Sequence, residues 1–282
     1  MLELGVGADI VRGVGAILWG ILALALLVAL VKPKSIKAKA LSCLLVLGIF
    51  FGPMVPGAMR AHEYKQRYAK AKALFDERCK TAGEKIYRTV EGVEGLLLMK
   101  VRPEKINFSD QYAMDDPYGT DYSGDGYPSS MLWGRNEKGE LRGTVKGGNT
   151  YKFVVARSKD KDKYLRYELG EPKSNGEFET IKTSTSNAPR FGVTFEDLSK
   201  PIDRENWIAG SRLQVVDSTN GDVLGERIGW MLDPALGDTS GGRSPWAFAA
   251  YNACPSFPKL HERYPVQEGQ TRNFVEKILK PI

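Results

Sequence analysis

The sequence predicts an α+β protein with an N-terminal two-helix transmembrane hairpin, a juxtamembrane helix, a mainly antiparallel β domain and a short C-terminal helix. Three observations predict this fold class. Two uncharged apolar runs occupy much of the first 59 residues, a polar stretch with helical spacing follows, and alternating apolar residues separated by turns fill most of the remainder. At 282 residues, the chain is long enough for such an anchor and one sizeable folded core.

The two apolar runs predict membrane spans at about 13–31 and 40–59. The first has no charge over its whole length, and it matches the number of residues that a helix needs to cross a hydrocarbon core of roughly 30 Å. The second ends near Pro53 and Pro56, which a membrane helix tolerates towards its end. A cleaved signal peptide is the alternative for the first run, but the opening segment lacks a basic stretch and a second run follows. Residues 1–59 therefore predict a hairpin in contact with the lipid bilayer.

The basic residues around the spans predict the orientation. Positively charged residues are enriched on the cytoplasmic side, and the turn between the spans contains Lys32, Lys34, Lys37 and Lys39. Several basic residues after the second span argue the other way: Arg60, Lys65, Arg67, Lys70 and Lys72. Because the first helix usually dominates, we expect a two-pass protein of a bacterial inner membrane with both chain ends in the periplasm.

Cys79 and Cys254 flank the large domain and predict a disulfide. Such a bond suits an oxidising compartment such as the periplasm. By restraining the unfolded chain, it would stabilise the fold by about 4–5 kcal/mol. Two unpaired core thiols in a cytoplasmic domain are the alternative.

Residues 60–83 are predicted to form the juxtamembrane helix. Its apolar face repeats at helical spacing, through Tyr64, Tyr68, Ala71, Phe75 and Cys79. Self-association through this helix and the spans, or a separate protein partner, is the expected mode of interaction.

Residues 84–282 are predicted to form a β-rich extracytoplasmic domain. Apolar side chains alternate in several short runs, for example at Phe191, Val193 and Phe195. The clearest hairpin spans 207–232, with Asn220 and Gly221 at its turn. A helix over 271–280, capped by Thr271, is expected to close the chain.

Charge and metal-ligand content exclude several function classes. The net charge of +6 is mild, and basic and acidic residues are interleaved, so we expect no nucleic acid partner. With two histidines and three cysteines, no metal-ligand spacing can be assembled, and we expect neither a metal nor a cofactor.

The segment GDTSGGRSPWAFAAYNACP, 237–255, resembles two catalytic motifs without matching either. An inserted Thr239 breaks the spacing of a serine-protease loop, and Arg243 replaces the lysine of a phosphate-binding loop. A structural interpretation accounts for the same residues, with Ser244 capping a helix that Pro245 starts and with Trp246, Phe248 and Ala249 packing inward. We therefore expect no catalytic residues.

The acidic and tyrosine-rich stretch 115–134 is the candidate binding loop. Rigid aromatic rings beside carboxylates are frequent on binding surfaces. Its candidate residues are Asp115, Asp116, Tyr118, Asp121, Tyr122, Asp125, Tyr127 and Trp133. An EF-hand is excluded because Leu132 takes the place of the final glutamate, which leaves an irregular calcium site or a loop packed on its own aromatics as alternatives. Replacing Tyr118 and Tyr122 with alanine is expected to weaken partner binding and leave folding intact.

The layout, together with the stretch RCKTAGEKIYRTVEGVEG around Cys79, resembles uncharacterised bacterial inner-membrane proteins with two spans and a β-rich extracytoplasmic domain. The resemblance implies a non-enzymatic, membrane-anchored binding or assembly module and assigns no active-site residue. The layout is also similar to that of bacterial anti-phage effectors, in which a β-rich domain senses a signal and the helices oligomerise to permeabilise the membrane. This alternative requires the large domain to be cytoplasmic.

Overall fold

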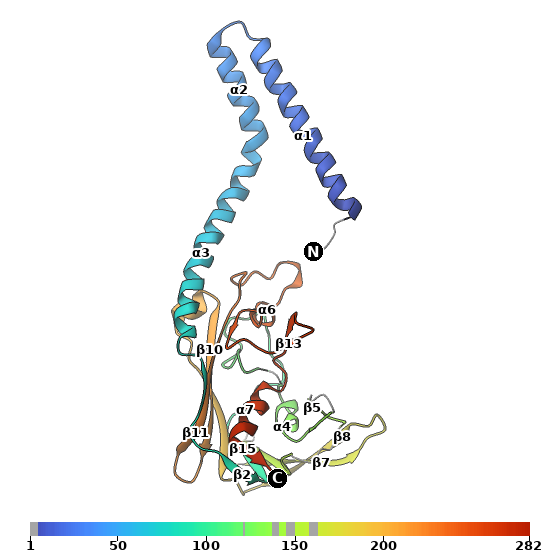
Figure 1. Cartoon of the computed structure of the whole chain (residues 1–282), viewed down its shortest axis with the longest axis vertical. Coiled ribbons are helices and arrows are strands. Elements are labelled where there is room, and N and C mark those ends of the chain that lie inside the picture. Colours follow the sequence, from blue (N-terminus) through green and yellow to red (C-terminus); the bar gives the residue numbers. More distant parts are fainter. Residues whose placement is uncertain (1–4, 121, 137–140, 145–149, 158–162) are drawn as a thin grey trace. The chain divides into compact units, whose positions relative to one another are not determined.

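The computed structural model describes residues 5–120, 122–136, 141–144, 150–157 and 163–282. The chain divides into two compact units, Met1–Gln66 and Arg67–Ile282, and each is described by itself (Figure 1). We call the second the sheet unit.

The first unit is helical. It contains α1 (Gly5–Val31), α2 (Ile36–Phe51), the 3-10 turn η1 (Gly52–Met54) and the start of α3 (Val55–Cys79). The Ser35 side chain caps α2 by accepting a hydrogen bond from the Ala38 amide at 3.2 Å, and Trp19 of α1 packs against Phe51 of α2. Two helical stretches are long and apolar enough to cross a membrane, Gly13–Val31 and the helical run that begins at Ile36.

The helix boundaries differ from the prediction around the two prolines. The predicted second span, 40–59, begins at Ile36, changes to a 3-10 turn at Gly52–Met54 and continues directly into α3. Pro53 lies in the 3-10 turn and Pro56 in the first turn of α3, where a missing N–H breaks no helical hydrogen bond. The prolines therefore mark a short interruption. The polar helix spans Val55–Cys79 and not 60–83, and Gly83 already belongs to a strand.

A nine-stranded sheet organises the described residues of the sheet unit. Its order is β1 (Gly83–Ile86), β11 (Asp222–Leu232), β10 (Ile208–Asp217), β9 (Phe191–Asp197), β3 (Gly95–Leu98), β6 (Phe153–Arg157), β7 (Tyr164–Pro172) and β8 (Phe178–Thr185), with β12 (Ala253–Cys254) also pairing with β11. Three short pairs are separate from it: β2 (Val90–Val93) with β15 (Leu279–Pro281), β4 (Gly134–Arg135) with β5 (Leu141–Arg142), and β13 (Lys259–Leu260) with β14 (Tyr264–Pro265).

The prediction of a mainly antiparallel sheet is confirmed, with one exception at its centre. β3 runs parallel to both of its neighbours, β6 and β9. Parallel strands need a long crossover connection, and residues 99–152 provide one between β3 and β6. Gly95–Leu98 is buried along its whole length, as expected for a strand covered on both faces.

The crossover and the end of the chain supply the helices that cover one face of this sheet. They are α4 (Gly126–Ser130) and α7 (Gln270–Ile278). Figure 1 shows α7 and α4 beside the sheet. Tyr127 of α4 and Phe274 and Ile278 of α7 join the main core with Leu96, Val154 and Leu213 from the sheet. α7 confirms the expected C-terminal helix, but its N-cap residue is Gly269 and not Thr271. The Thr271 hydroxyl is buried and donates to the Gly119 carbonyl at 3.1 Å, so it holds the crossover and does not cap the helix.

The predicted hairpin over 207–232 is formed by β10 and β11. Gly221 adopts a φ of 79° at the turn, which glycine tolerates without strain. The buried Asp217 beside the turn accepts hydrogen bonds from Arg190 and Thr219. These bonds hold the pKa of the Asp217 carboxyl well below its usual range.

Two helices cover opposite faces of the end where β10 begins and β11 ends. Ala71 and Phe75 of α3 pack against Ile208, Trp230 and Leu232. On the other face, Trp246 and Ala249 of α6 (Pro245–Ala249) pack with Ala209 and Met231. Successive residues of a strand point to opposite faces of the sheet, so neighbouring residues of β10 and of β11 pack against different helices. The remaining short helices of the sheet unit are α5 (Pro201–Glu205) and η2 (Ser240–Gly242).

The predicted disulfide between Cys79 and Cys254 is present. It joins the last residue of α3 to β12, with a Cα–Cα distance of 5.7 Å and a sequence separation of 175 between the two cysteines. The bond therefore closes nearly the whole sheet unit into one covalent loop.

We expect Cys79→Ser or Cys254→Ser to lower the free energy of unfolding of the sheet unit by about 2–5 kcal/mol, because the open unfolded chain has more conformational freedom. Urea denaturation followed by tryptophan fluorescence measures the change. Cys43→Ser, which removes the free cysteine in α2, is the matched control and should leave this transition unchanged. A disulfide variant with the stability of the wild type would contradict the expectation.

Candidate binding site

The crossover is fixed to the sheet by a buried ion pair between Arg102 and Asp116. Asp116 Oδ2 lies 2.6 Å from Arg102 Nη2, and both side chains are almost completely buried. Asp116 Oδ1 accepts from the Gly119 amide at 3.0 Å and from the Ser211 hydroxyl of β10. The Arg102 guanidinium lies 4.2 Å from the centre of the Tyr127 ring and also donates to the Thr271 hydroxyl. The pair thus links the crossover with β10, α4 and α7.

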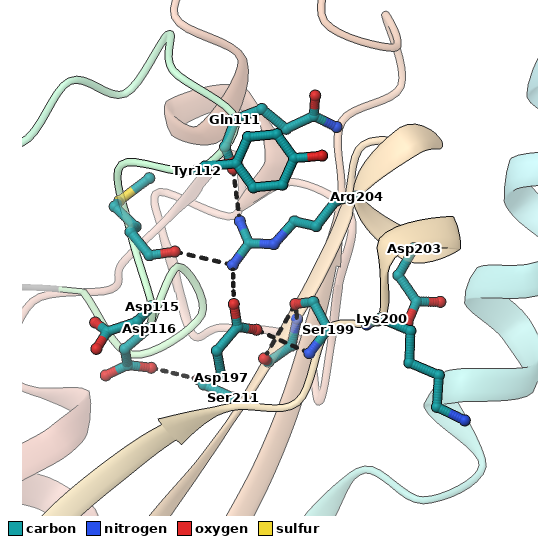
Figure 2. A network of polar contacts seen from close by, with 12 residues as sticks. Gln111, Tyr112, Asp115, Asp116, Asp197, Ser199, Lys200, Asp203, Arg204 and Ser211 are labelled. Carbon is teal, nitrogen blue, oxygen red and sulfur yellow. Dashed lines mark hydrogen bonds and ion pairs between the residues drawn. The ribbon is translucent and has the colours of Figure 1, made fainter.

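A second buried cation, Arg204 of α5, holds the part of the crossover before Asp116. Its guanidinium donates to the carbonyls of Gln111 and Met114 at 2.7 and 2.9 Å, and to Asp197 Oδ2 at 2.5 Å (Figure 2). Figure 2 shows that Arg204 reaches from α5 to the crossover on one side and to the end of β9 on the other. Residues 111–116 are therefore held by charge-assisted bonds, which are stronger than neutral ones.

Two tyrosines of the predicted binding loop point into the protein. Tyr127 is completely buried in the main core. Tyr118 stacks on Phe257 with ring centres 4.7 Å apart, and its hydroxyl donates to the Pro255 carbonyl at 2.9 Å. Gly229 makes room for this ring, since a Cβ there would come within 2.2 Å of it. Burial raises the pKa of Tyr118 to about 12. Tyr118→Ala would leave a cavity and is expected to destabilise the protein, contrary to the expectation from the sequence that folding stays intact.

The other predicted residues are less buried, and most of their polar groups are bonded. Asp115 pairs with Lys100 at 2.9 Å, and Asp125 pairs with Lys182 and accepts from the Tyr167 hydroxyl. Tyr122 and Trp133 are brought together edge to face, with ring centres 5.1 Å apart. Asp121 lies outside the described residues.

No metal site is found around these carboxylates. Asp115, Asp116 and Asp125 each face a cation of the protein, and no group of three His, Cys, Asp or Glu side chains that could hold a metal ion occurs within the described ranges. An irregular calcium site over this stretch thus has no support from the described residues.

The predicted loop nevertheless borders four pockets of the sheet unit. Thr120 lines a pocket of about 570 Å³, and Tyr122 lines a neighbouring one of about 330 Å³. Asp125 lines two more, of about 490 and 420 Å³, and Trp133 contributes to the second of these. Tyr118 and Tyr127 of the loop therefore pack in the interior, whereas Thr120, Tyr122, Asp125 and Trp133 line pockets.

The pocket of about 490 Å³, which we call the strand-end pocket, is the best candidate for ligand binding. It lies where β3 and β6 end, because the carboxyl ends of parallel strands meet at the same edge of a sheet. After β3 the crossover leaves the edge, whereas β6 is followed by the antiparallel β7. Its lining side chains are Met99, Val101, Arg102, Pro103, Glu104, Asp125, Arg157, Leu165 and Tyr167.

The strand-end pocket combines apolar walls with a few polar groups, as ligand sites commonly do. Met99, Val101 and Leu165 provide apolar surface. Within the part of the chain that the structure describes, the exposed Arg157 makes no ion pair. Burial and the bond to Asp125 raise the pKa of Tyr167, so its phenol stays neutral. The pocket therefore presents apolar walls beside two exposed side chains of opposite charge, Arg157 and Glu104, and Arg157 is the one that can bind an anionic group.

The motif-like segment 237–255 uses its polar groups within the fold. Arg243, at the lysine position of a phosphate-binding loop, pairs with the buried Asp233 and lies over the Phe248 ring at 4.8 Å. Asp238 accepts from Ser240. Pro245 starts α6, and Trp246 and Ala249 are buried as predicted, but Phe248 is 47% exposed and Ser244 makes no capping bond through its side chain. Sequence reasoning was wrong on these last two residues because the helix has only five residues and one buried face.

Sequence reasoning missed most of the strand-end pocket. Arg157 and Leu165 sit in strands whose local pattern signals only β structure, and Met99 directly follows one. Only the pairing of β3 with β6, across more than fifty residues of chain, brings them to one place.

Comparison with known proteins adds no assignment, since no family model, curated protein or solved structure matches this chain.

We expect Asp116→Asn to lower the free energy of unfolding by about 3–5 kcal/mol, because it leaves the buried Arg102 without its counter-charge. Asp115→Asn makes the same chemical change one residue away on an exposed ion pair, and it should cost about 1 kcal/mol or less. Urea denaturation of both variants measures the difference. Equal losses would show that Asp116 does not hold the crossover.

Proposed function

We propose that the protein is a membrane-anchored, non-enzymatic binding module of a bacterial inner membrane that presents its β-rich domain to a protein partner in the periplasm. The observation that carries this proposal is that a sheet unit closed by a disulfide follows two helices apolar enough to span a membrane. Lasting disulfides are typical of oxidising compartments, which favours a periplasmic location over a cytoplasmic one.

The lysine-rich turn between the helices supports the same orientation. Residues 32–39 carry four lysines and no acid, which favours retention of this turn in the cytoplasm. Both chain ends, and with them the sheet unit, are then periplasmic. Because its two helices would span the membrane, the lipid bilayer is one partner of such a protein.

The strand-end pocket supports a binding role. Its volume of about 490 Å³ suits one or two side chains of a partner, and its apolar walls lie beside the unpaired Arg157 guanidinium of the described chain. We propose that it accepts a segment in which an apolar residue adjoins an aspartate or glutamate. A charged group next to an apolar anchor provides specificity in addition to affinity.

A non-enzymatic role fits the use of the motif-like residues. Arg243 is neutralised by Asp233, and Asp116 by Arg102. Groups engaged in such buried pairs are poorly placed to act as acids, bases or nucleophiles towards a substrate.

A reporter fused after Ile282 tests the location. Alkaline phosphatase at this position should be active and a fluorescent protein dark, because the first folds only in the periplasm. A fluorescent fusion with inactive phosphatase would overturn the periplasmic proposal and favour the anti-phage effector described above.

A matched pair of charge reversals tests the pocket. We expect Arg157→Glu to reduce the amount of partner crosslinked to the full-length protein in cells about tenfold, because it replaces attraction with repulsion at the pocket. Lys200→Glu is the control: Lys200 is exposed, makes no ion pair among the described residues, and points away from the network in Figure 2. Equal yields from Arg157→Glu and Lys200→Glu would exclude the strand-end pocket as the partner site.

A further inference from the structure

Four large apolar side chains of the sheet unit are exposed close together in the chain. Phe248, Tyr251, Leu260 and Tyr264 are each exposed by 47–52%, and we call them the aromatic face. Phe248 and Tyr251 stack at 6.4 Å, and Tyr251, Leu260 and Tyr264 line the same pocket of about 570 Å³. Soluble surfaces rarely expose several large apolar side chains together, so a partner or a membrane is expected to cover them.

The face has the composition of a membrane interface. Two of its members are tyrosines, whose apolar rings and polar tips suit the headgroup level of a bilayer. Exposed Lys259 and Arg263 flank Leu260 and Tyr264 in the β13–β14 hairpin, and Glu262 and Glu268 are their exposed acidic neighbours. Basic residues next to exposed apolar ones, as Lys259 and Arg263 are here, can bind the phosphates of anionic lipids.

The β13–β14 hairpin has a tight turn between its two strands. His261 and Glu262 adopt left-handed φ angles of 50° and 57° at this turn, where the Arg263 amide donates to the Leu260 carbonyl at 3.1 Å. Residues other than glycine adopt this conformation rarely, and such strain is frequent at functional surfaces.

The segment of chain that joins the sheet unit to the predicted span is short. α6 leads into the aromatic face, and it packs on the same end of β10 and β11 as residues 71 and 75 of α3. Only seven residues lie between Met59, the last residue of the predicted span, and Arg67, the start of the sheet unit. The eight residue-to-residue steps from Met59 to Arg67 cover about 12 Å as a helix and at most about 29 Å when extended. A tether this short makes even a weak contact effective, because the local concentration of lipid surface is high.

We propose that Phe248, Tyr251, Leu260 and Tyr264 form a lipid-contacting face that docks the sheet unit on the anionic surface of the membrane in which the protein is anchored. The inference rests on the proposed function, since it requires the two apolar helices to span that membrane. It adds a second membrane contact and leaves the strand-end pocket to the protein partner.

Site-specific photocrosslinking tests this proposal in the full-length chain. A benzophenone amino acid replaces Tyr264, and the protein is reconstituted in vesicles of phosphatidylethanolamine and phosphatidylglycerol. The same label at Leu24, which is 65% exposed on α1, reports the span, and at Ile181, 44% exposed on β8, it reports a surface outside the aromatic face. We expect lipid adducts from positions 264 and 24 and none from position 181.

The possible results separate the two proposals. Lipid adducts from position 24 but not 264 would overturn the lipid-contacting face and leave the membrane anchor standing. Absence of adducts from both would overturn the anchor and the proposed function with it. Adducts from 264 to another protein or to a second copy of the chain would identify the face as a protein interface and overturn the inference.

A surface variant gives an independent measurement. Leu260→Ser removes one exposed member of the face and should not affect folding. Because about half of the Leu260 side chain is exposed and can be buried against lipid, the yield of lipid adducts from position 264 should fall roughly three- to tenfold. Tyr112→Ser is the control. It also replaces an exposed apolar side chain with serine, but at a position of the crossover outside the aromatic face, where Tyr112 is 68% exposed, and it should leave the yield unchanged. An unchanged yield in Leu260→Ser would contradict the inference.

Discussion

The buried ion pair between Arg102 and Asp116 is the interaction on which the arrangement of the sheet unit depends. Residues 99–152 must cross from β3 to β6 over one face of the sheet, and such a long segment loses much conformational entropy when it is ordered. Burying two charges is itself costly, but here the carboxylate also receives Gly119 and Ser211, and the guanidinium also bonds Thr271. With these groups satisfied, the crossover, β10 and α7 form one unit.

The position of the strand-end pocket follows from the same crossover. Since β3 lies parallel to β6, their ends share an edge, and the departing crossover leaves a hollow beside Met99 and Leu165. The crossover then turns Tyr118 and Tyr127 inward and places Asp125 at the rim, where Lys182 and Tyr167 hold it. Interior packing and pocket lining are thus performed by alternate parts of one segment.

The proposed membrane contact and the proposed partner site complement one another physically. A domain held by a single helix can take many orientations, and a partner must restrict them when it binds. The proposed contact of the aromatic face with lipid would restrict these orientations beforehand, so less orientational freedom would be lost when a partner binds at the strand-end pocket. The disulfide restricts motion within the sheet unit, because it joins the end of α3 to β12, which follows α6 in the chain.

The sequence by itself determined the features that depend on local pattern: the apolar helices, the β10–β11 hairpin with Gly221, the α+β class and the closing helix. It also predicted the disulfide, because the two cysteines flank a whole domain. The predicted helix boundaries near Pro53 and Pro56 and the predicted cap of α7 were wrong. The backbone hydrogen bonds that decide them form after the prolines and around Gly269. Only the tertiary structure decided that Asp116 and Tyr118 are buried, whereas Phe248 is exposed. It also brought Arg157 and Asp125 to the same pocket, because the parallel pairing of β3 and β6 is a long-range contact that no local spacing records.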